Sequence, residues 1–193
     1  MEPVAQSLSE ADGFAVARVT KAIALREAGI DKRILVLAGA HTRDELEAAG
    51  QHGLELAVHD HRQLELLEGA DPRRPLRTWI KVDTGMHRLG LLPTEVPAVL
   101  ERLTACAAVP TTPGLMTHLA NADDPKDPLS ELQCTRLLAL AQEGQELNIG
   151  NSAGILAFPS ARTDWVRPGI MLYGSSPFSG CDAPGGGGMS AEA

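Results

Sequence analysis

The chain has 193 residues, of which 44% are hydrophobic and 22% are charged, the composition of an ordinary globular domain. Its 25 acidic and 17 basic residues give a formal net charge of −8. That balance disfavours nucleic acid and anionic membranes as partners, since phosphate binding requires a basic face.

The three cysteines are too few and too scattered for a disulfide framework or a zinc site, so we expect no metal (Cys106, Cys134, Cys181). The N-terminal stretch lacks the basic and apolar regions of a signal peptide. No window approaches the roughly 20 apolar residues of a membrane span. We therefore expect a soluble, cytoplasmic protein.

Short apolar or β-branched runs alternate along the chain with helical stretches. Strands are predicted over residues 13–18, 33–39, 54–59, 77–83, 114–120, 148–154 and 165–174. Helical stretches follow the first five at 20–29, 42–53, 60–69, 93–106 and 128–145, and the first ten residues resemble the end of an earlier helix. Seven such units, with strands buried on both faces, predict an α/β fold with a parallel sheet.

Two architectures suit this pattern, an open doubly wound sheet and a closed (β/α) barrel. No GxGxxG follows the first strand, so the dinucleotide-binding open sheet lacks support. Polar residues instead recur where strands end, which is where barrel enzymes place their sites (Arg18, His59, Asp83, His118, Asn151, Ser152). The prediction is an incomplete barrel with seven strands in place of eight.

The sequence pattern divides the chain into a predicted domain and a tail. Residues 11–178 form the predicted partial barrel. Residues 179–193 contain four consecutive glycines among small and polar residues, a composition that cannot bury a core, so we expect a flexible tail.

The stretch WIKVDTGMHRLGL, residues 79–91, combines an apolar strand with an unusual density of charge. Lys81, Asp83, His87 and Arg88 follow one another within eight residues. A packed lysine stem, a turn at Asp83 and a surface arginine would explain them without any function. The alternative is a set of charges fixed at a strand end for chemistry.

The stretch RPGIMLYG, residues 167–174, indicates an anion site. Pro168 removes one N–H and Gly169 permits close backbone approach, so the amides of Gly169 and Ile170 could form an anion-binding nest. Arg167 adds a positive donor for a ring nitrogen or a carboxylate. Together with the serine hydroxyl of NSAG, residues 151–154, these amides suit a phosphate ester.

Four stretches in consistent order carry a resemblance to a known family. They are KVDTGMHRLG (81–90), GLMTHLANADD (114–124), NSAGILAFP (151–159) and DWVRPGIMLYGSSPF (164–178). The chain closely resembles alanine racemase, the fold-type III enzyme that uses pyridoxal 5'-phosphate to interconvert L-alanine and D-alanine. The resemblance implies alanine as substrate, D-alanine supply for peptidoglycan, and a homodimer in the full-length family.

The resemblance also assigns two catalytic residues. Lys81 matches a lysine that is commonly carbamylated, which converts an ammonium into an anion. That carbamate orients the arginine matching Arg88, which hydrogen-bonds the phenolic oxygen of the cofactor and lies near the substrate carboxylate. A carboxylate-like group fixes a guanidinium by paired hydrogen bonds, so the arrangement is physically reasonable.

The remaining matches concern cofactor binding. Arg167 matches the arginine that faces the pyridine nitrogen, and because it stays charged the ring nitrogen remains unprotonated, which favours racemisation over transamination. His118 matches a histidine that supports that arginine. The phosphate and neighbouring cofactor-binding positions are Asn151, Ser152, Gly169 and Ile170.

Other residues receive a structural interpretation. His59 and His61 are close in sequence, but they lie at a strand end beside a helix start, and we expect no metal there. Tyr173 is the only tyrosine, yet it does not match the catalytic tyrosine of the family. Lys21 lies at a helix start and does not match the lysine that holds the cofactor.

That cofactor lysine lies in the family in a segment resembling VKANAYGHG, and nothing similar occurs in the 193 residues. The catalytic tyrosine, which belongs to a C-terminal β-domain, has no counterpart either. We therefore expect the chain by itself to be an inactive fragment of an isomerase. The alternatives are a non-catalytic barrel remnant that binds the cofactor, and a related fold-type III serine racemase or amino-acid decarboxylase; the HRLG and RPGIMLYG details favour alanine racemase over the latter.

Overall fold

The computed structural model describes residues 2–71 and 73–178, so the predicted tail at 179–193 lies outside the described residues. The chain divides into two compact units. The first comprises Met1–Lys81 and Glu95–Pro113, and the second comprises Val82–Thr94 and Gly114–Ala193.

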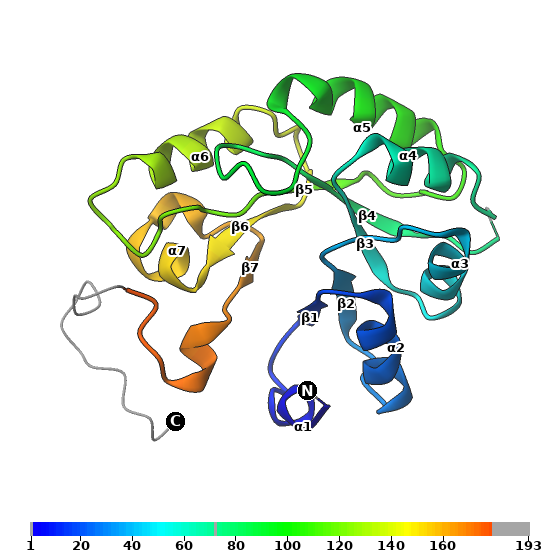
Figure 1. Ribbon diagram of the computed structural model, residues 1–193, viewed down its shortest axis with the longest axis horizontal. Helices are drawn as coiled ribbons and strands as arrows, with labels where there is room; N and C mark the ends of the chain where they lie inside the picture. Colours follow the sequence, from blue (N-terminus) through cyan, green and yellow to red (C-terminus); the bar gives the residue numbers. More distant parts are fainter. Residues whose placement is uncertain (1, 72, 179–193) are drawn as a thin grey trace. The chain divides into compact units, whose positions relative to one another are not determined.

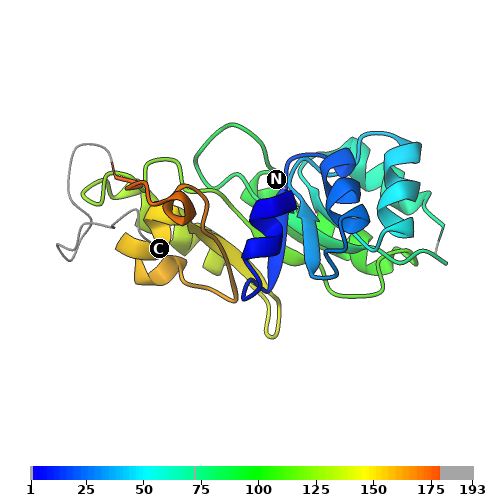
Figure 2. The ribbon, with the colours of Figure 1, turned by 90° about the horizontal axis from the view of Figure 1, so that it is seen from below.

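The first unit contains a parallel sheet of four strands whose neighbours follow the chain order: β1 (Gly13–Val16), β2 (Arg33–Val36), β3 (Glu55–Val58) and β4 (Arg77–Lys81). Its helices are α1 (Glu2–Ser7), α2 (Val19–Glu27), α3 (Arg43–Gln51), α4 (His61–Glu68) and α5 (Val96–Ala105). Helices α2, α3 and α4 lie next to one another in chain order (Figures 1 and 2). These strand–helix–strand connections are the ones that the alternating sequence pattern predicts.

Side-chain caps define where two of these helices begin. Asp60 accepts hydrogen bonds from the backbone N–H groups of Arg62 and Gln63 at the start of α4. Thr42 accepts one from Glu45 at the start of α3. Each cap satisfies amides that have no partner inside the helix, and so it sets the point at which the chain leaves the preceding strand.

The core of the first unit is mainly aliphatic and also contains buried polar residues, among them a carboxylate. Ile34, Leu56 and Ile80 are almost completely buried on neighbouring strands. Glu55 is also buried, and its carboxylate accepts a 2.8 Å hydrogen bond from Trp79 Nε1 and is paired with Arg33. A buried carboxylate is tolerated here because charged and polar donors satisfy it.

The second unit contains a parallel sheet of three strands, β5 (Gly114–Met116), β6 (Leu147–Asn151) and β7 (Trp165–Arg167), again in chain order. Its helices are α6 (Leu129–Leu138) and α7 (Ser152–Ala157), with short 3₁₀ turns η2 (Pro159–Ala161) and η3 (Ile170–Tyr173); a further turn, η1 (Pro93–Glu95), precedes α5. The seven predicted strands and their parallel pairing within each unit are confirmed.

Two boundary predictions are wrong. The last strand ends at Arg167, and Ile170–Tyr173 forms a 3₁₀ turn, because Pro168 has no N–H to donate to a strand ladder. The helix expected over 128–145 ends at Leu138, and the following residues turn through Gly144, whose φ is 73°. Among the described residues, no helix combines the length and apolarity needed to cross a membrane.

Candidate functional site

The loop that follows β4 closes on itself. Leu91 forms a parallel bridge with Val82, and its carbonyl accepts a 2.9 Å hydrogen bond from the N–H of Asp83. Gly90, with φ of 141°, makes this closure possible, because a Cβ atom there would lie 2.5 Å from the Asp83 nitrogen. Residues 83–91 therefore form a loop with joined ends, held at the carboxyl end of a buried strand.

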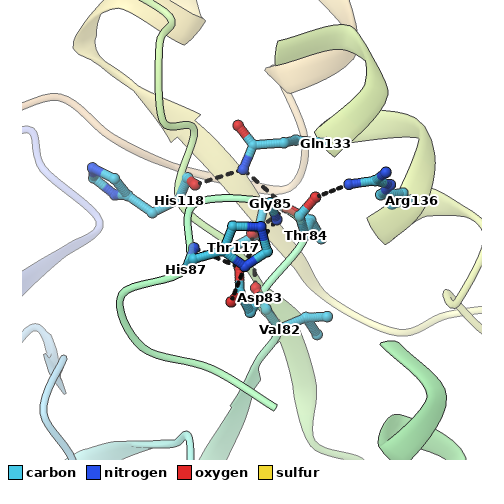
Figure 3. Close-up of polar contacts among 9 residues, drawn as sticks. All are labelled: Val82, Asp83, Thr84, Gly85, His87, Thr117, His118, Gln133 and Arg136. Atoms are coloured by element: carbon cyan, nitrogen blue, oxygen red, sulfur yellow. Dashed lines mark hydrogen bonds and ion pairs between the residues drawn. The ribbon is translucent and has the colours of Figure 1, made fainter. Parts of the chain in front are cut away.

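Asp83 organises the interior of this loop. One carboxylate oxygen accepts hydrogen bonds of 3.0 Å from the N–H groups of Gly85 and His87, and the other lies 3.1 Å from His87 Nδ1 (Figure 3). His87 adopts φ of 57°, a left-handed conformation that is uncommon outside glycine and that these bonds stabilise. Asp83 therefore fixes the backbone immediately before Arg88.

The protonation of Asp83 gives a first testable expectation. Burial by itself would raise the pKa of its carboxyl, but the N–H donors of His87 and Gly85 and the nearby His87 ring hold the pKa below its ordinary value. A depressed pKa means that the stabilising contribution is complete above the ordinary carboxyl value and is lost as the pH falls through the depressed pKa.

We therefore expect the ¹³Cγ resonance of Asp83 to titrate with a midpoint below the ordinary value of about 3.9 for aspartate. The measurement is an NMR titration of the labelled chain, with Asp83→Asn identifying the resonance by its loss. A midpoint above the ordinary value would show that burial outweighs the hydrogen bonds.

Arg88 lies on the exposed part of the loop and, among the described residues, makes no hydrogen bond or ion pair. Lys81 is the last residue of β4, in the first unit, and is buried with 7% exposure. The structure thus places Lys81 at the end of the strand and Arg88 in the loop that follows it. Their interaction through a carbamate stays a prediction.

Arg167 ends β7, and its guanidinium is held by acceptors on the neighbouring strand β6 and by the carbonyl of Thr117, which follows β5. Its Nη2 donates to the carbonyls of Thr117 at 2.6 Å and Ile149 at 3.3 Å. Its Nη1 donates to the carbonyl of Asn148 at 3.2 Å and to the Asn148 side-chain oxygen. Within the described residues, the Nε–H group is the one donor of this guanidinium that makes no hydrogen bond. Burial lowers the pKa of Arg167 to about 10.

That pKa keeps the guanidinium charged at neutral pH. Four of its five N–H donors fix its orientation, and the fifth has no protein acceptor in the described part of the chain. This arrangement suits a neutral acceptor such as a ring nitrogen, because the arginine can donate a hydrogen bond to it without giving up a proton.

Ser152 gathers backbone amides from the segment after β7. Its buried hydroxyl accepts hydrogen bonds from the N–H groups of Gly169 at 2.8 Å and Met171 at 3.4 Å. Two amides that converge on one oxygen mark a place where a phosphate oxygen could be bound, so the residues present fit this part of the expected cofactor. The second amide that donates to Ser152 is that of Met171. The sequence predicted the amide of Ile170 as the partner of Gly169 in an anion site, and Ile170 is exposed.

The other two predicted cofactor residues have contacts of their own. Asn151 caps α7 by accepting a 2.8 Å hydrogen bond from Gly154, and its side-chain nitrogen donates to the Leu119 carbonyl at 3.4 Å. His118 follows β5, and its imidazole extends away from Gln133 while its carbonyl accepts a hydrogen bond from that side chain (Figure 3). The capping role of Asn151 is structural, and contact of either residue with a cofactor stays a prediction.

Sequence reasoning missed Gln133 and Thr84, two buried polar residues behind these loops. A recognisable signal existed for Gln133. It lies on the buried stripe of α6, where the spacing calls for an apolar residue, and a polar side chain on such a stripe indicates specific hydrogen bonding.

The residues given a structural interpretation have local partners. His59 Nε2 lies 3.0 Å from the Ala38 carbonyl, and His61 Nε2 lies 2.8 Å from a Glu95 carboxylate oxygen. The described residues contain no cluster of three or more side chains able to hold a metal ion. Lys21 lies within α2 and Tyr173 ends η3.

Comparison with known proteins places this arrangement in a family. Residues 1–177 match the family model described as "Alanine racemase, N-terminal domain". The chain belongs to the alanine racemase family. Alanine racemase from Nitrosococcus oceani is 46% identical over 176 residues, which are 91% of this chain and 49% of that protein.

Solved alanine racemase structures show the same fold. The biosynthetic alanine racemase from Pseudomonas aeruginosa has a TM-score of 0.86 at 38% identity, over 93% of this chain and 51% of that chain. The alanine racemase from Acinetobacter baumannii has a TM-score of 0.81 at 33% identity, over 90% and 49% respectively. The predicted fold class, the α/β barrel type of the alanine racemase N-terminal domain, is confirmed, and the chain spans about half the length of the relatives it matches.

Proposed function

We propose that this chain forms the cofactor-binding wall of an alanine racemase, an isomerase that interconverts L-alanine and D-alanine with pyridoxal 5'-phosphate. The observation that carries the proposal is the arrangement around Arg167 and Ser152. It combines a fixed, charged guanidinium that has one donor left over with a pair of converging amides in the same unit.

When bound, the cofactor supplies an electron sink for the negative charge that develops at the alanine Cα atom. In this proposal Ser152 and the amides of Gly169 and Ile170 hold the phosphate, with Met171 as a further donor. Arg167 would donate to the ring nitrogen and, with a pKa of about 10, would leave that nitrogen unprotonated.

Lys81 and Arg88 complete the proposed site. A carbamate on Lys81 would orient Arg88 toward the phenolic oxygen of the cofactor and the substrate carboxylate. The exposed position of Arg88, which has no partner among the described residues, is consistent with an arginine that meets its acceptors on a ligand. His118 would support Arg167 from the segment that follows β5.

The wider role follows from the same proposal. Production of D-alanine supplies peptidoglycan synthesis, and the chemistry takes place in the cytoplasm. A complete enzyme would act as a homodimer. The 193 residues contain no counterpart of the family's cofactor lysine, so the chain alone should hold pyridoxal phosphate weakly and without a covalent bond.

The test compares pyridoxal 5'-phosphate with pyridoxal, which lacks the phosphate, by fluorescence titration of the purified chain. We expect measurable binding of the phosphorylated form and at least tenfold weaker binding of pyridoxal, since charge-assisted hydrogen bonds contribute about 1.5–3 kcal/mol. Treatment with borohydride should leave no adduct in the mass spectrum. Equal affinity for the two compounds, or a stable adduct on one lysine, would contradict the proposal.

A further inference from the structure

A buried chain of hydrogen bonds in the second unit connects the elements that carry Arg88, His118 and Arg167. It runs through Gln133 of α6, Thr84 of the loop after β4 and Thr117 after β5, each of which has at most 1% exposure. These three side chains and the Val82 carbonyl are called the Gln133 network below (Figure 3).

The chemistry of its neighbours fixes the orientation of the Gln133 amide. Its oxygen accepts a 2.8 Å hydrogen bond from the N–H of Ala120, which can only donate. Its nitrogen donates to the carbonyl of His118 at 3.0 Å, which can only accept, and to the hydroxyl of Thr84 at 3.2 Å. The side chain therefore holds both ends of the turn that carries His118 and also reaches the loop after β4.

Proton counting then gives the network a direction. Thr117 has one hydroxyl proton and donates it to the carbonyl of Val82 at 2.9 Å. The 2.7 Å contact between the two threonine hydroxyls must accordingly use the proton of Thr84. Gln133 donates to Thr84, Thr84 to Thr117, and Thr117 to Val82, so each hydroxyl accepts once and donates once.

Further contacts extend this network to the proposed site residues. Arg136, one turn along α6 from Gln133, donates to the carbonyl of Thr84 at 2.7 Å and fixes the start of the loop that leads to Arg88. The carbonyl of Thr117 accepts the 2.6 Å hydrogen bond from Arg167. One displacement in the network would thus move three candidate site elements.

We infer that Gln133 is a positioning residue for this site, acting through Thr84 and Thr117 on the placement of Arg88, His118 and Arg167. The inference rests on the proposed function only in treating those three residues as site residues. The coupling of Gln133 to their positions is a property of the hydrogen bonds within the chain.

The chain offers a matched control for Gln133. Gln63 on α4 is a buried helix glutamine that also joins two loops, accepting from the N–H of His59 at 2.9 Å and donating to the carbonyl of Ala38 at 2.8 Å. It lies in the first unit, and its side-chain hydrogen bonds are to Ala38 and His59. Gln133→Glu and Gln63→Glu both keep the shape of the side chain and remove its donors.

The experiment measures trypsin cleavage of the folded chain after Arg88 by mass spectrometry, together with urea unfolding of every variant. We expect Gln133→Glu to accelerate cleavage of the Arg88–Leu89 bond about tenfold, the effect of losing a buried hydrogen bond on local opening. Gln63→Glu should leave that rate within about twofold of wild type at comparable overall stability. Equal acceleration by both variants, or by neither, would overturn the inference.

A second pair of variants covers the case in which buried glutamate prevents folding. Thr84→Val removes the central hydroxyl, whereas Thr84→Ser retains it. Thr78→Val is the control, since the hydroxyl of Thr78 is buried and has no hydrogen-bond partner in the described part of the chain. Thr84→Val should accelerate the Arg88 cleavage about tenfold and the other two should not; the same rate in Thr84→Val and Thr84→Ser would contradict a role for the network.

Titration with pyridoxal 5'-phosphate separates this inference from the proposed function. Where the wild-type chain binds the cofactor, Gln133→Glu should weaken binding and Gln63→Glu should not. Absence of binding by the wild-type chain counts against the proposed function, and the cleavage rates then still decide whether Gln133 positions the loop.

Discussion

The 193-residue chain, supplied with pyridoxal 5'-phosphate and L-alanine, is expected to form D-alanine no faster than the free cofactor does. Racemisation removes the Cα proton from one face and returns a proton to the other, which requires two positioned bases. General acid–base groups contribute about 10²–10⁴-fold each. In the proposed site Arg88 and Arg167 would orient and polarise, but arginine side chains do not serve as the two bases.

None of the four lysines lies in a segment that matches the family's cofactor lysine (Lys21, Lys32, Lys81, Lys126). The only tyrosine is Tyr173. It lies in residues 164–178, a stretch that resembles the family's barrel domain, and it does not match the family's catalytic tyrosine. The assay measures D-alanine with purified chain against cofactor alone, with the Pseudomonas aeruginosa alanine racemase as the positive control. Turnover well above background that Lys21→Ala or Lys81→Ala abolishes would show that one of these lysines serves as a base.

Replacement of Arg167 by alanine is expected to reduce the free energy of unfolding by about 3 kcal/mol. The guanidinium donates to the carbonyl of Thr117, directly after β5, and to those of Asn148 and Ile149 within β6. Its removal leaves these acceptors to find water in a site where burial already lowers the arginine pKa to about 10. Cofactor binding should be lost in the same variant, since the variant lacks the proposed donor to the ring nitrogen.

Arg162 provides the comparison for this prediction. It is exposed and also donates to backbone carbonyls, those of Ile155 at 2.7 Å and Leu156 at 3.4 Å. Arg162→Ala should cost less than about 1 kcal/mol in urea unfolding and leave cofactor binding unchanged. Equal losses in the two variants would show that Arg167 has no special structural role, and Arg167→Lys should fall between them because an ammonium has three donors instead of five.

Much of this architecture follows from local sequence pattern. Alternating apolar strands and helices predict a parallel sheet because strands buried on both faces and helical periodicity are properties of short segments. The polar residues Asp83, His118 and Ser152 were predicted near the carboxyl ends of strands, and in the structure all three lie within two residues after a strand end. Arg167 was predicted within the last strand and instead ends it. Their order along the chain is also what reveals the family.

The local sequence pattern did not predict the backbone correctly where a single proline or glycine changes its course. Residues 168–174 read as a continuation of a strand because they are apolar, but Pro168 ends the ladder and the chain turns at η3. The closure of the loop on Gly90 is similar, since a glycine in sequence does not reveal that the Asp83 backbone lies where its Cβ would be.

The sequence by itself determined the strand–helix order, the family and the positions that carry charge at strand ends. Only the tertiary structure decided which polar groups meet: Gln133 bonds Thr84, 49 residues earlier, and Arg167 bonds Thr117, 50 residues earlier. The physical reason is that periodicity reports which face of an element is buried, whereas hydrogen-bond partners depend on the packing of elements far apart in the chain. A buried glutamine is therefore visible in the sequence as an irregular core position, and the structure is needed to say what it holds in place.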